Sequence, residues 1–203
     1  MMKPAIRLKR CDVEHLRIST QRKGFASLSS ALDADSLRAL RAEAARLACE
    51  TSRAEQRAGV RYRAGIAPLG PRALGVLRSR QLDSLLCRVF GRRYVLSEER
   101  SCLTRYEEGD HLGAHRDEPA GECTVTVIVY LEAKARRCAT RTGLELRVYG
   151  RTLASHRRPR LVIPTRAGTL VVGRGSRYWH ERPTMSKGER VVALTACYRR
   201  AGP

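Results

Sequence analysis

The sequence predicts a mostly β protein with flanking helices: a double-stranded β-helix (jelly roll) with N-terminal helices packed on one face. Two observations support this prediction. The first half of the chain contains two segments whose apolar residues recur at helical spacing. The second half is a succession of short β-rich segments separated by turn residues, which is typical of a sandwich or barrel. We expect one domain over residues 1–203, with helical support over 1–95 and a jelly-roll core over 96–203.

Two segments in the first half are predicted to be helices. The first spans residues 32–50 (LDADSLRALRAEAARLACE), where Asp33 or Asp35 can cap the amino end. Its apolar stripe consists of Leu37, Leu40, Ala44 and Leu47. The second spans residues 78–91 (RSRQLDSLLCRVFG) and ends with a glycine, a common helix stop. Residues 57–75, between them, contain two prolines and are predicted to be a loop.

The segments that follow are predicted to be strands because they are short, rich in β-branched and aromatic residues, and separated by turn signals. They read RYVLS, SCLTRYEE, CTVTVIVYLEA, LELRVYG, PRLVI, GTLVVG, RYWHE and RVVALTACYRR. Many short strands at close spacing favour a closed or layered sheet. This part of the chain therefore provides the jelly roll, against which the helices pack.

The charge of the chain is extreme, with 40 Lys and Arg against 20 Asp and Glu and a net charge of +20. An acidic partner such as nucleic acid, a carrier protein or a phosphorylated substrate would explain it. Coding bias would explain the preference for arginine over lysine, but not the excess of bases over acids. The charge is also uneven, because residues 134–160 hold nine bases and one acid, whereas 98–122 hold eight acids and three arginines.

The seven cysteines are scattered and include no C-x-x-C pair, so we expect free thiols rather than a disulfide framework or a zinc knuckle. No apolar run approaches the ~20 residues that cross a bilayer, so no membrane partner is expected. The N-terminal segment lacks the apolar stretch of a secretory signal. The expected location is therefore cytoplasmic.

A candidate metal site begins with His115 and Asp117, two positions apart and just ahead of a β-branched run. On an extended chain residues i and i+2 point to the same side, so the pair can present two ligands to one metal. His180, between two predicted strands, is available as a third ligand. Two histidines and one carboxylate suit non-haem Fe(II) with three open positions.

The sequence around these residues resembles that of the Fe(II)- and 2-oxoglutarate-dependent oxygenases, especially the prolyl-4-hydroxylase-like branch. The resemblance covers roughly the last half of the chain. The segment YEEGDHLGAHRD matches that branch's Y-x-x-G-x(5)-H-x-D pattern, and TVIVYL, TGLEL and PTRAGTLVV match the strand and turns that follow. His180 and Arg190, ten residues apart, match the distal metal ligand and the basic residue that follows it.

The resemblance implies an enzyme, a 2-oxoglutarate-dependent dioxygenase. His115, Asp117 and His180 would ligate Fe(II), and 2-oxoglutarate and O2 would be the co-substrates. Oxidative decarboxylation of 2-oxoglutarate to succinate and CO2 would drive hydroxylation of an unactivated C–H bond. A carboxylate at position 117 argues against halogenation, because related halogenases have a small residue there.

The resemblance also implies three co-substrate contacts. Arg190 would form a salt bridge with the C5 carboxylate of 2-oxoglutarate, for which a planar guanidinium is suited. Tyr130 fits a tyrosine that donates a hydrogen bond to the same carboxylate, and Tyr106 fits a residue near the keto-acid end. Both tyrosines could equally be core aromatics.

The substrate stays open between three alternatives. The prolyl-hydroxylase-like pattern favours an amino acid, an amino-acid derivative or a peptidyl residue. The charge leaves open an AlkB-like oxidative demethylase of nucleic acid, although the spacing after the distal histidine differs from that group. A basic nucleic-acid-binding module on the same fold is the non-catalytic alternative. We expect a small-molecule or peptidyl substrate, with an acidic carrier protein or nucleic acid as the partner that the charge would suit.

Overall fold

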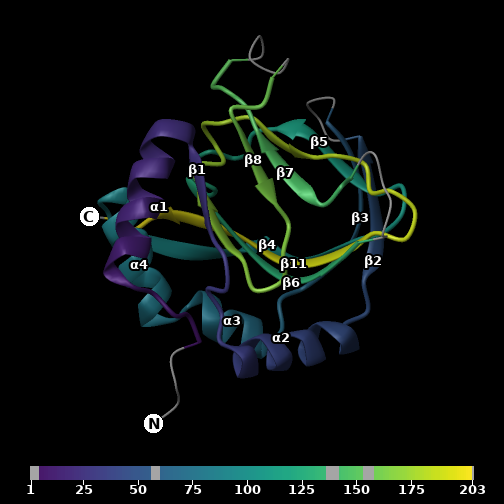
Figure 1. The fold of residues 1–203 in the computed structure, drawn as a ribbon, viewed down its shortest axis with the longest axis horizontal. Helices are drawn as coiled ribbons and strands as arrows, with labels where there is room; N and C mark the ends of the chain where they lie inside the picture. Colours follow the sequence, from purple (N-terminus) through teal and green to yellow (C-terminus); the bar gives the residue numbers. More distant parts are fainter. Residues whose placement is uncertain (1–4, 56–59, 136–141, 153–157, 203) are drawn as a thin grey trace.

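The computed structural model describes residues 5–55, 60–135, 142–152 and 158–202 (Figure 1). Within these residues the chain forms four helices and eleven strands. The helices are α1 (Arg10–Lys23), α2 (Ala34–Arg46), α3 (Pro71–Leu77) and α4 (Arg80–Phe90). The strands are β1 (Phe25–Leu28), β2 (Glu50–Glu55), β3 (Arg61–Ala67), β4 (Tyr94–Tyr106), β5 (His111–His115), β6 (Val125–Lys134), β7 (Glu145–Val148), β8 (Leu161–Pro164), β9 (Leu170–Gly173), β10 (His180–Arg182) and β11 (Arg190–Arg200).

The strands join one antiparallel sheet that curls into a nearly closed barrel. Their order across the sheet is β1-β9-β6-β11-β4-β3-β5-β10-β7-β8, and β2 pairs with β3. The curl places β5, β7 and β8 in one layer over β4, β6 and β11 in the other (Figure 1). The prediction of a mostly β fold with flanking helices is therefore confirmed.

The helices pack on the outer face of the layer that contains β4, β6 and β11 (Figure 1). Successive side chains of a strand point to opposite faces of the sheet, so each of these strands supplies two cores. In β6 the residues of the core shared with the helices are Val125, Val127, Val129 and Leu131. Ile128 and Tyr130 of the same strand belong to a second core inside the barrel. The barrel interior is the part of the fold that can hold a site.

Both predicted helices are present, as α2 and α4. Asp33 caps α2, because its side chain accepts hydrogen bonds from the backbone N–H groups of Asp35 and Ser36, both at 3.0 Å. Ser79 caps α4 in the same way. Gly91 ends α4 in the left-handed conformation with φ 76°, which glycine adopts without strain.

The first half of the chain contains more structure than the sequence predicts. The predicted loop over 57–75 holds β3 and α3, because β3 pairs with β2, β4 and β5 and Pro71 stands at the first position of α3. With β1 and β2, three strands of the sheet come from the segment expected to be helical support. The helix α1 is also present, although few of its residues are buried.

Two further expectations concern the cysteines and the membrane. Cys123 and Cys197 form a disulfide, so these two are not free thiols as predicted. Their Cα atoms lie 4.6 Å apart because the loop before β6 meets β11 there. Among the described residues, no helix combines the length and the apolar character that a membrane span requires.

Candidate active site

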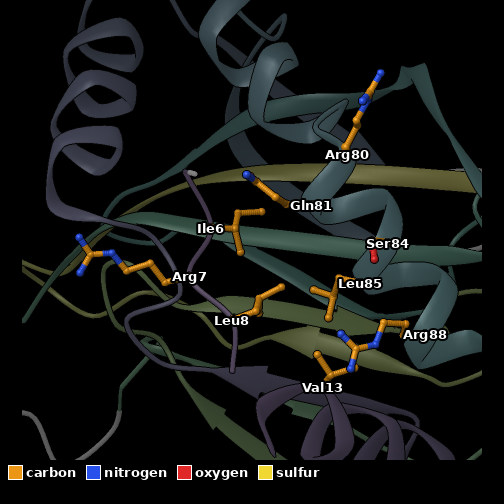
Figure 2. A pocket seen from close by; sticks show the side chains of 9 residues that line it. All are labelled: Ile6, Arg7, Leu8, Val13, Arg80, Gln81, Ser84, Leu85 and Arg88. Carbon is orange, nitrogen blue, oxygen red and sulfur yellow. The ribbon is translucent and has the colours of Figure 1, made fainter. Parts of the chain in front are cut away.

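The cavity that contains His115, Asp117 and His180 lies inside the barrel and has a volume of about 380 Å³. A larger hollow of about 650 Å³ lies between the N-terminal segment, α1 and α4. Figure 2 shows that Arg7 and Arg80 at the edge of this larger hollow point away from one another. Its lining contains no histidine, cysteine or carboxylate that could bind a metal. The barrel cavity is therefore the candidate active site.

Three predicted ligand residues meet in the barrel cavity. His115 ends β5 and His180 begins β10, and the two residues are paired opposite one another in the sheet. The Oδ1 atom of Asp117 lies 3.2 Å from Nε2 of His115 and 3.4 Å from Nε2 of His180. Two bonds of about 2.1 Å at right angles on one metal would separate their ligand atoms by roughly 3.0 Å. The three atoms are therefore spaced to hold a single ion.

The orientation of the two histidine rings is fixed by the backbone. The Nδ1 atom of His115 lies 3.0 Å from the carbonyl oxygen of Gly113, and Nδ1 of His180 lies 3.0 Å from that of Tyr178. A carbonyl only accepts hydrogen bonds, so each Nδ1 carries the proton. With Nδ1 engaged in this way, Nε2 is the atom of each ring that can bind a metal, which is the usual arrangement of metal-binding histidines.

Asp117 is held with one oxygen free for a metal. The Thr126 hydroxyl donates a hydrogen bond to Oδ2, which leaves Oδ1 facing the histidines. Gly175 closes the other side, because a Cβ atom at that position would overlap Oδ2 and the Thr126 hydroxyl. Burial alone would raise the pKa of Asp117, but His180 and His115 hold this pKa well below its usual range. The carboxylate is therefore ionised and ready to bind a cation.

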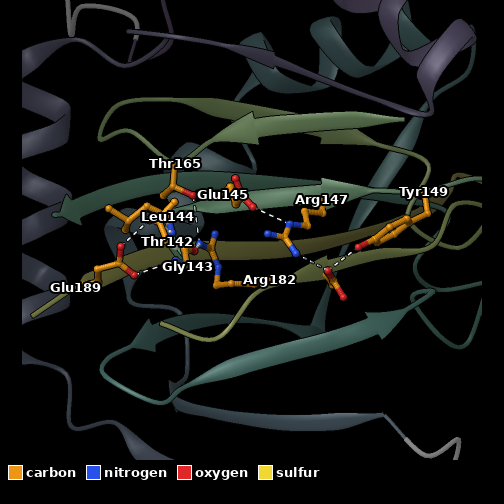
Figure 3. A network of polar contacts seen from close by, with 10 residues as sticks. Thr142, Gly143, Leu144, Glu145, Arg147, Tyr149, Thr165, Arg182 and Glu189 are labelled. Atoms are coloured by element: carbon orange, nitrogen blue, oxygen red, sulfur yellow. Dashed lines mark hydrogen bonds and ion pairs between the residues drawn. The ribbon is translucent and has the colours of Figure 1, made fainter. Parts of the chain in front are cut away.

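The inner end of the cavity contains a buried arginine, Arg182, which is 4% exposed. Its Nη2 donates to the Tyr130 hydroxyl at 2.7 Å, and its Nη1 donates to the Gly143 carbonyl at 2.9 Å and the Thr165 hydroxyl at 3.2 Å. Figure 3 shows Arg182 beside Gly143 and Thr165 at the centre of this polar network. The guanidinium also lies over the rings of Tyr106 and Tyr130, at 5.1 and 5.3 Å from their centres.

The cavity thus has a metal-ligand set at one place and a cation at another. The two histidines and one carboxylate suit Fe(II), which binds this facial set with positions left open for other ligands. Residues 102–198 match the family model of the 2OG-Fe(II) oxygenase superfamily. This part of the chain is therefore similar to the 2OG-Fe(II) oxygenases. The cofactors of these oxygenases are Fe(II), 2-oxoglutarate and O2, and the donor set of the cavity fits the metal.

Solved structures of oxygenases share the fold. An oxidoreductase of the 2OG-Fe(II) oxygenase family from Burkholderia pseudomallei is 19% identical, with 99% of this chain and 97% of that chain covered and a TM-score of 0.69. A Pseudomonas putida prolyl-4-hydroxylase is 19% identical over 94% of this chain and 100% of that chain, with a TM-score of 0.64. The epimerase SnoN, solved with Fe3+, alpha-ketoglutarate and nogalamycin RO, is 19% identical over 95% of this chain and 85% of that chain, with a TM-score of 0.72. A search of curated protein sequences finds no match.

Of the three residues expected to contact the co-substrate, two line the barrel cavity. Tyr130 and Tyr106 line its inner end, and burial raises the pKa of Tyr106, so its hydroxyl stays protonated. Arg190 does not line the cavity. Its Nε lies 3.6 Å from Glu132 and 4.0 Å from Glu107, and its side chain is 39% exposed. The alternation of side chains along β11 explains this position, because Val191 belongs to the core inside the barrel.

Sequence reasoning missed Arg182, Thr126 and Gly175 in the candidate site. A signal for Arg182 was present, since it lies two positions after His180 and so faces the same side of β10. Thr126 stands nine positions after Asp117 and meets it only because the loop between them folds back. Gly175 gives no sequence signal, because its role depends on a contact with a segment far away in the chain.

Proposed function

We propose that this protein is an Fe(II)- and 2-oxoglutarate-dependent dioxygenase that hydroxylates an unactivated C–H bond of an amino acid, an amino-acid derivative or a peptidyl residue. The observation that carries the proposal is the set of three ligand atoms at one end of a cavity whose inner end holds a buried cation. A family match over residues 102–198 supports the reaction class. The likeness to a prolyl-4-hydroxylase supports assignment to that branch.

His115, Asp117 and His180 would hold the iron. Their roles follow from the fixed ring orientations and from the one free oxygen of Asp117. Bound Fe(II) would supply the oxidative decarboxylation of 2-oxoglutarate by O2, which yields succinate and CO2 and oxidises the substrate. The protein contributes three ligand atoms spaced for one ion and an ionised carboxylate.

The co-substrate would lie between the metal ligands and the inner end of the cavity. One end of 2-oxoglutarate is a keto acid that can bind a metal, and the other is a carboxylate that needs a cation and hydrogen-bond donors. The inner end offers the guanidinium of Arg182 and the hydroxyl of Tyr130. Tyr106 adds an aromatic wall over the guanidinium.

The substrate would enter at the outer part of the cavity. Tyr62, Ile66 and Cys102 line one side of it, and Arg116 stacks over Trp179 on another, with the guanidinium carbon 5.2 Å from the ring centre. A volume of about 380 Å³ is at the small end of the range for ligand pockets, and 2-oxoglutarate would occupy part of it. The remaining space favours a single small group, such as one amino-acid side chain, as the part that reaches the iron.

The test is release of succinate by the purified protein with Fe(II) and 2-oxoglutarate under air. A panel of free amino acids, amino-acid derivatives, peptides and methylated oligonucleotides would be offered, and products would be identified by mass. We expect succinate release to rise with one of the first three classes, together with a product heavier by one oxygen. Succinate release stimulated only by methylated oligonucleotides would replace this proposal with the demethylase. No binding of Fe(II) and 2-oxoglutarate at all would overturn the reaction class.

A further inference from the structure

We propose that Arg182, and not Arg190, binds the far carboxylate of 2-oxoglutarate. This inference rests on the proposed function and moves the co-substrate anchor from the last strand, β11, to β10, the strand that begins with the distal metal ligand. The resemblance described above selects Arg190, which lies ten positions after His180. The structure separates the two arginines by burial, by charge partners and by the face of the sheet they occupy.

The charge of Arg182 is not compensated by any carboxylate of the described residues. Its three hydrogen-bond partners are a carbonyl and two hydroxyls, all neutral, and no ion pair of the described part of the chain includes it. A buried charge that lacks an opposite charge is costly, whereas a carboxylate placed beside it gains a charge-assisted hydrogen bond. The environment of Arg182 therefore calls for an anionic ligand.

The hydrogen-bond inventory of Arg182 leaves room for that ligand. A guanidinium has five N–H donors, and three hydrogen bonds to protein atoms account for three of them. Two donors are left for a ligand, which is the number that a carboxylate takes in a two-point contact. The hydroxyl of Tyr130, 2.7 Å from Nη2, is placed to donate to the same carboxylate because it already accepts from Arg182.

His180 and Arg182 line the same cavity from one strand, β10. His180 and Arg182 are two residues apart, and a strand rises about 3.3 Å per residue, so their backbones are separated by roughly 6.6 Å. The same strand thus sets both the position of the metal and the position of the anchor.

The network around Arg182 is held in place before any ligand arrives. The Glu189 carboxylate accepts hydrogen bonds from the Gly143 N–H at 2.8 Å and the Thr142 hydroxyl at 2.5 Å, so the Gly143 carbonyl is fixed where Arg182 contacts it (Figure 3). A side chain at position 143 would collide with Met185, whose Cα would lie 2.7 Å from the added Cβ. An anchor of this kind loses little freedom on binding.

Arg190 has the opposite properties. Its Nε lies 3.6 Å from Glu132 and 4.0 Å from Glu107, so two carboxylates face its charge, although this Nε makes no hydrogen bond. Its neighbour Val191 is the residue of β11 that faces the barrel interior at this level. For Arg190 to reach the cavity, the first residues of β11 would have to turn over, which would expose Val191.

The experiment measures the affinity of the protein for 2-oxoglutarate under anaerobic conditions with Fe(II), by calorimetry and by the visible absorption of the complex. We expect Arg182→Ala to weaken binding by at least roughly 30-fold, since loss of one partner of a buried charge pair is costly. Added guanidinium ion should restore part of that affinity. Arg182→Lys keeps the charge but lacks the planar guanidinium. Its affinity for 2-oxoglutarate should lie between those of Arg182→Ala and the unaltered protein. Arg190→Ala should stay within about twofold of the unaltered protein.

Cobalt(II) titration of every variant, in the absence of 2-oxoglutarate, checks that the His115–Asp117–His180 site is still folded. If Arg182→Ala fails to fold, Arg190→Ala decides alone, because a loss of more than tenfold there would overturn the inference. Unchanged affinity in a folded Arg182→Ala variant would also overturn it. These outcomes differ from failure of the proposed function, in which the unaltered protein itself would bind no 2-oxoglutarate and release no succinate.

Discussion

The two faces of strands β6 and β11 are built from alternate residues of the same segments, yet they differ in chemistry. On the face toward the helices, β11 places Val192, Leu194, Ala196 and Tyr198 in a core with the leucines of α1 and α4. On the face toward the barrel, it places the smaller side chains of Ala193, Thr195 and Cys197 along the cavity. One face fills space with large apolar groups, whereas the other carries smaller side chains and leaves a cavity.

This difference separates stability from reactivity within one sheet. Apolar side chains packed on the helix side gain free energy from burial and need no partner of matching polarity. The cavity side contains the ionised Asp117 and the cation of Arg182, whose burial is costly unless each is paired. Substitutions on the two faces should therefore change different measurable properties, and this comparison can be tested from the largest effect to the smallest.

His180→Ala tests the cavity face most directly. Mutation of a residue that hydrogen-bonds to a metal ligand typically lowers metal affinity or activity by about 10–100-fold. Loss of a ligand itself should lower them by more. We expect succinate release to fall by more than about 100-fold and the visible band of the Fe(II)–2-oxoglutarate complex to disappear. The thermal unfolding midpoint without metal is the control for folding, because His180 is buried and packs against Phe25. A His180→Ala protein that keeps both the band and the turnover would remove this residue from the metal site.

Leu86→Ala tests the helix side, where this fully buried side chain of α4 belongs to the apolar core. Truncation of a buried leucine lowers the free energy of unfolding by about 2–5 kcal/mol. Denaturant titration should show that loss, while the affinity for 2-oxoglutarate of the folded protein stays within about twofold. A variant of normal stability with weakened 2-oxoglutarate binding would contradict the separation of the two faces.

Gly175→Ala tests how tightly the cavity face is fitted around the metal ligand. The added methyl group would meet Oδ2 of Asp117 and the Thr126 hydroxyl, so the carboxylate must turn. We expect Fe(II) affinity to drop by about 10–100-fold, as for other changes next to a metal ligand. Gly121→Ala, where an added Cβ meets nothing, is the matched control and should leave Fe(II) affinity unchanged. Equal affinities in the two variants would show that Asp117 needs no support from this side.

The sequence allowed the prediction of elements whose signals are local. The helices α2 and α4 follow from apolar spacing and caps, and the strands of the second half follow from β-rich composition and turns. The helix α1 was missed because it buries few residues, and β3 was missed because its pairing partners, not its composition, make it a strand. The segments RYVLS and SCLTRYEE form the single strand β4 for the same reason, since β11 pairs with both.

The residues of the candidate site also divide into those that local spacing predicts and those that depend on the fold. His115 and Asp117 could be predicted because two positions on a strand share a side, and His180 because its type completes an iron-binding set. The role of Arg190 was implied by the family resemblance, in which a basic residue follows the distal histidine. That spacing runs through the loop between β10 and β11 and does not determine the face of the sheet that a residue reaches. Counting along the strand itself, from His180 to Arg182, preserves that face and would have selected the buried arginine.

The smallest effect on turnover is expected from arginines that lie outside both faces of the sheet. Arg158 and Arg160 belong to the arginine-rich stretch over 134–160, of which 136–141 and 153–157 lie outside the described residues. If the reaction takes a small or peptidyl substrate inside the barrel, Arg158→Glu together with Arg160→Glu should leave turnover within about twofold, and added salt should have little effect. If a polyanion must bind there, each phosphate contact adds about 0.7–0.9 to the slope of log affinity against log salt. Turnover that collapses in this double variant while its fold is intact would extend the functional surface beyond the cavity, and would favour nucleic acid or an acidic carrier protein as the partner.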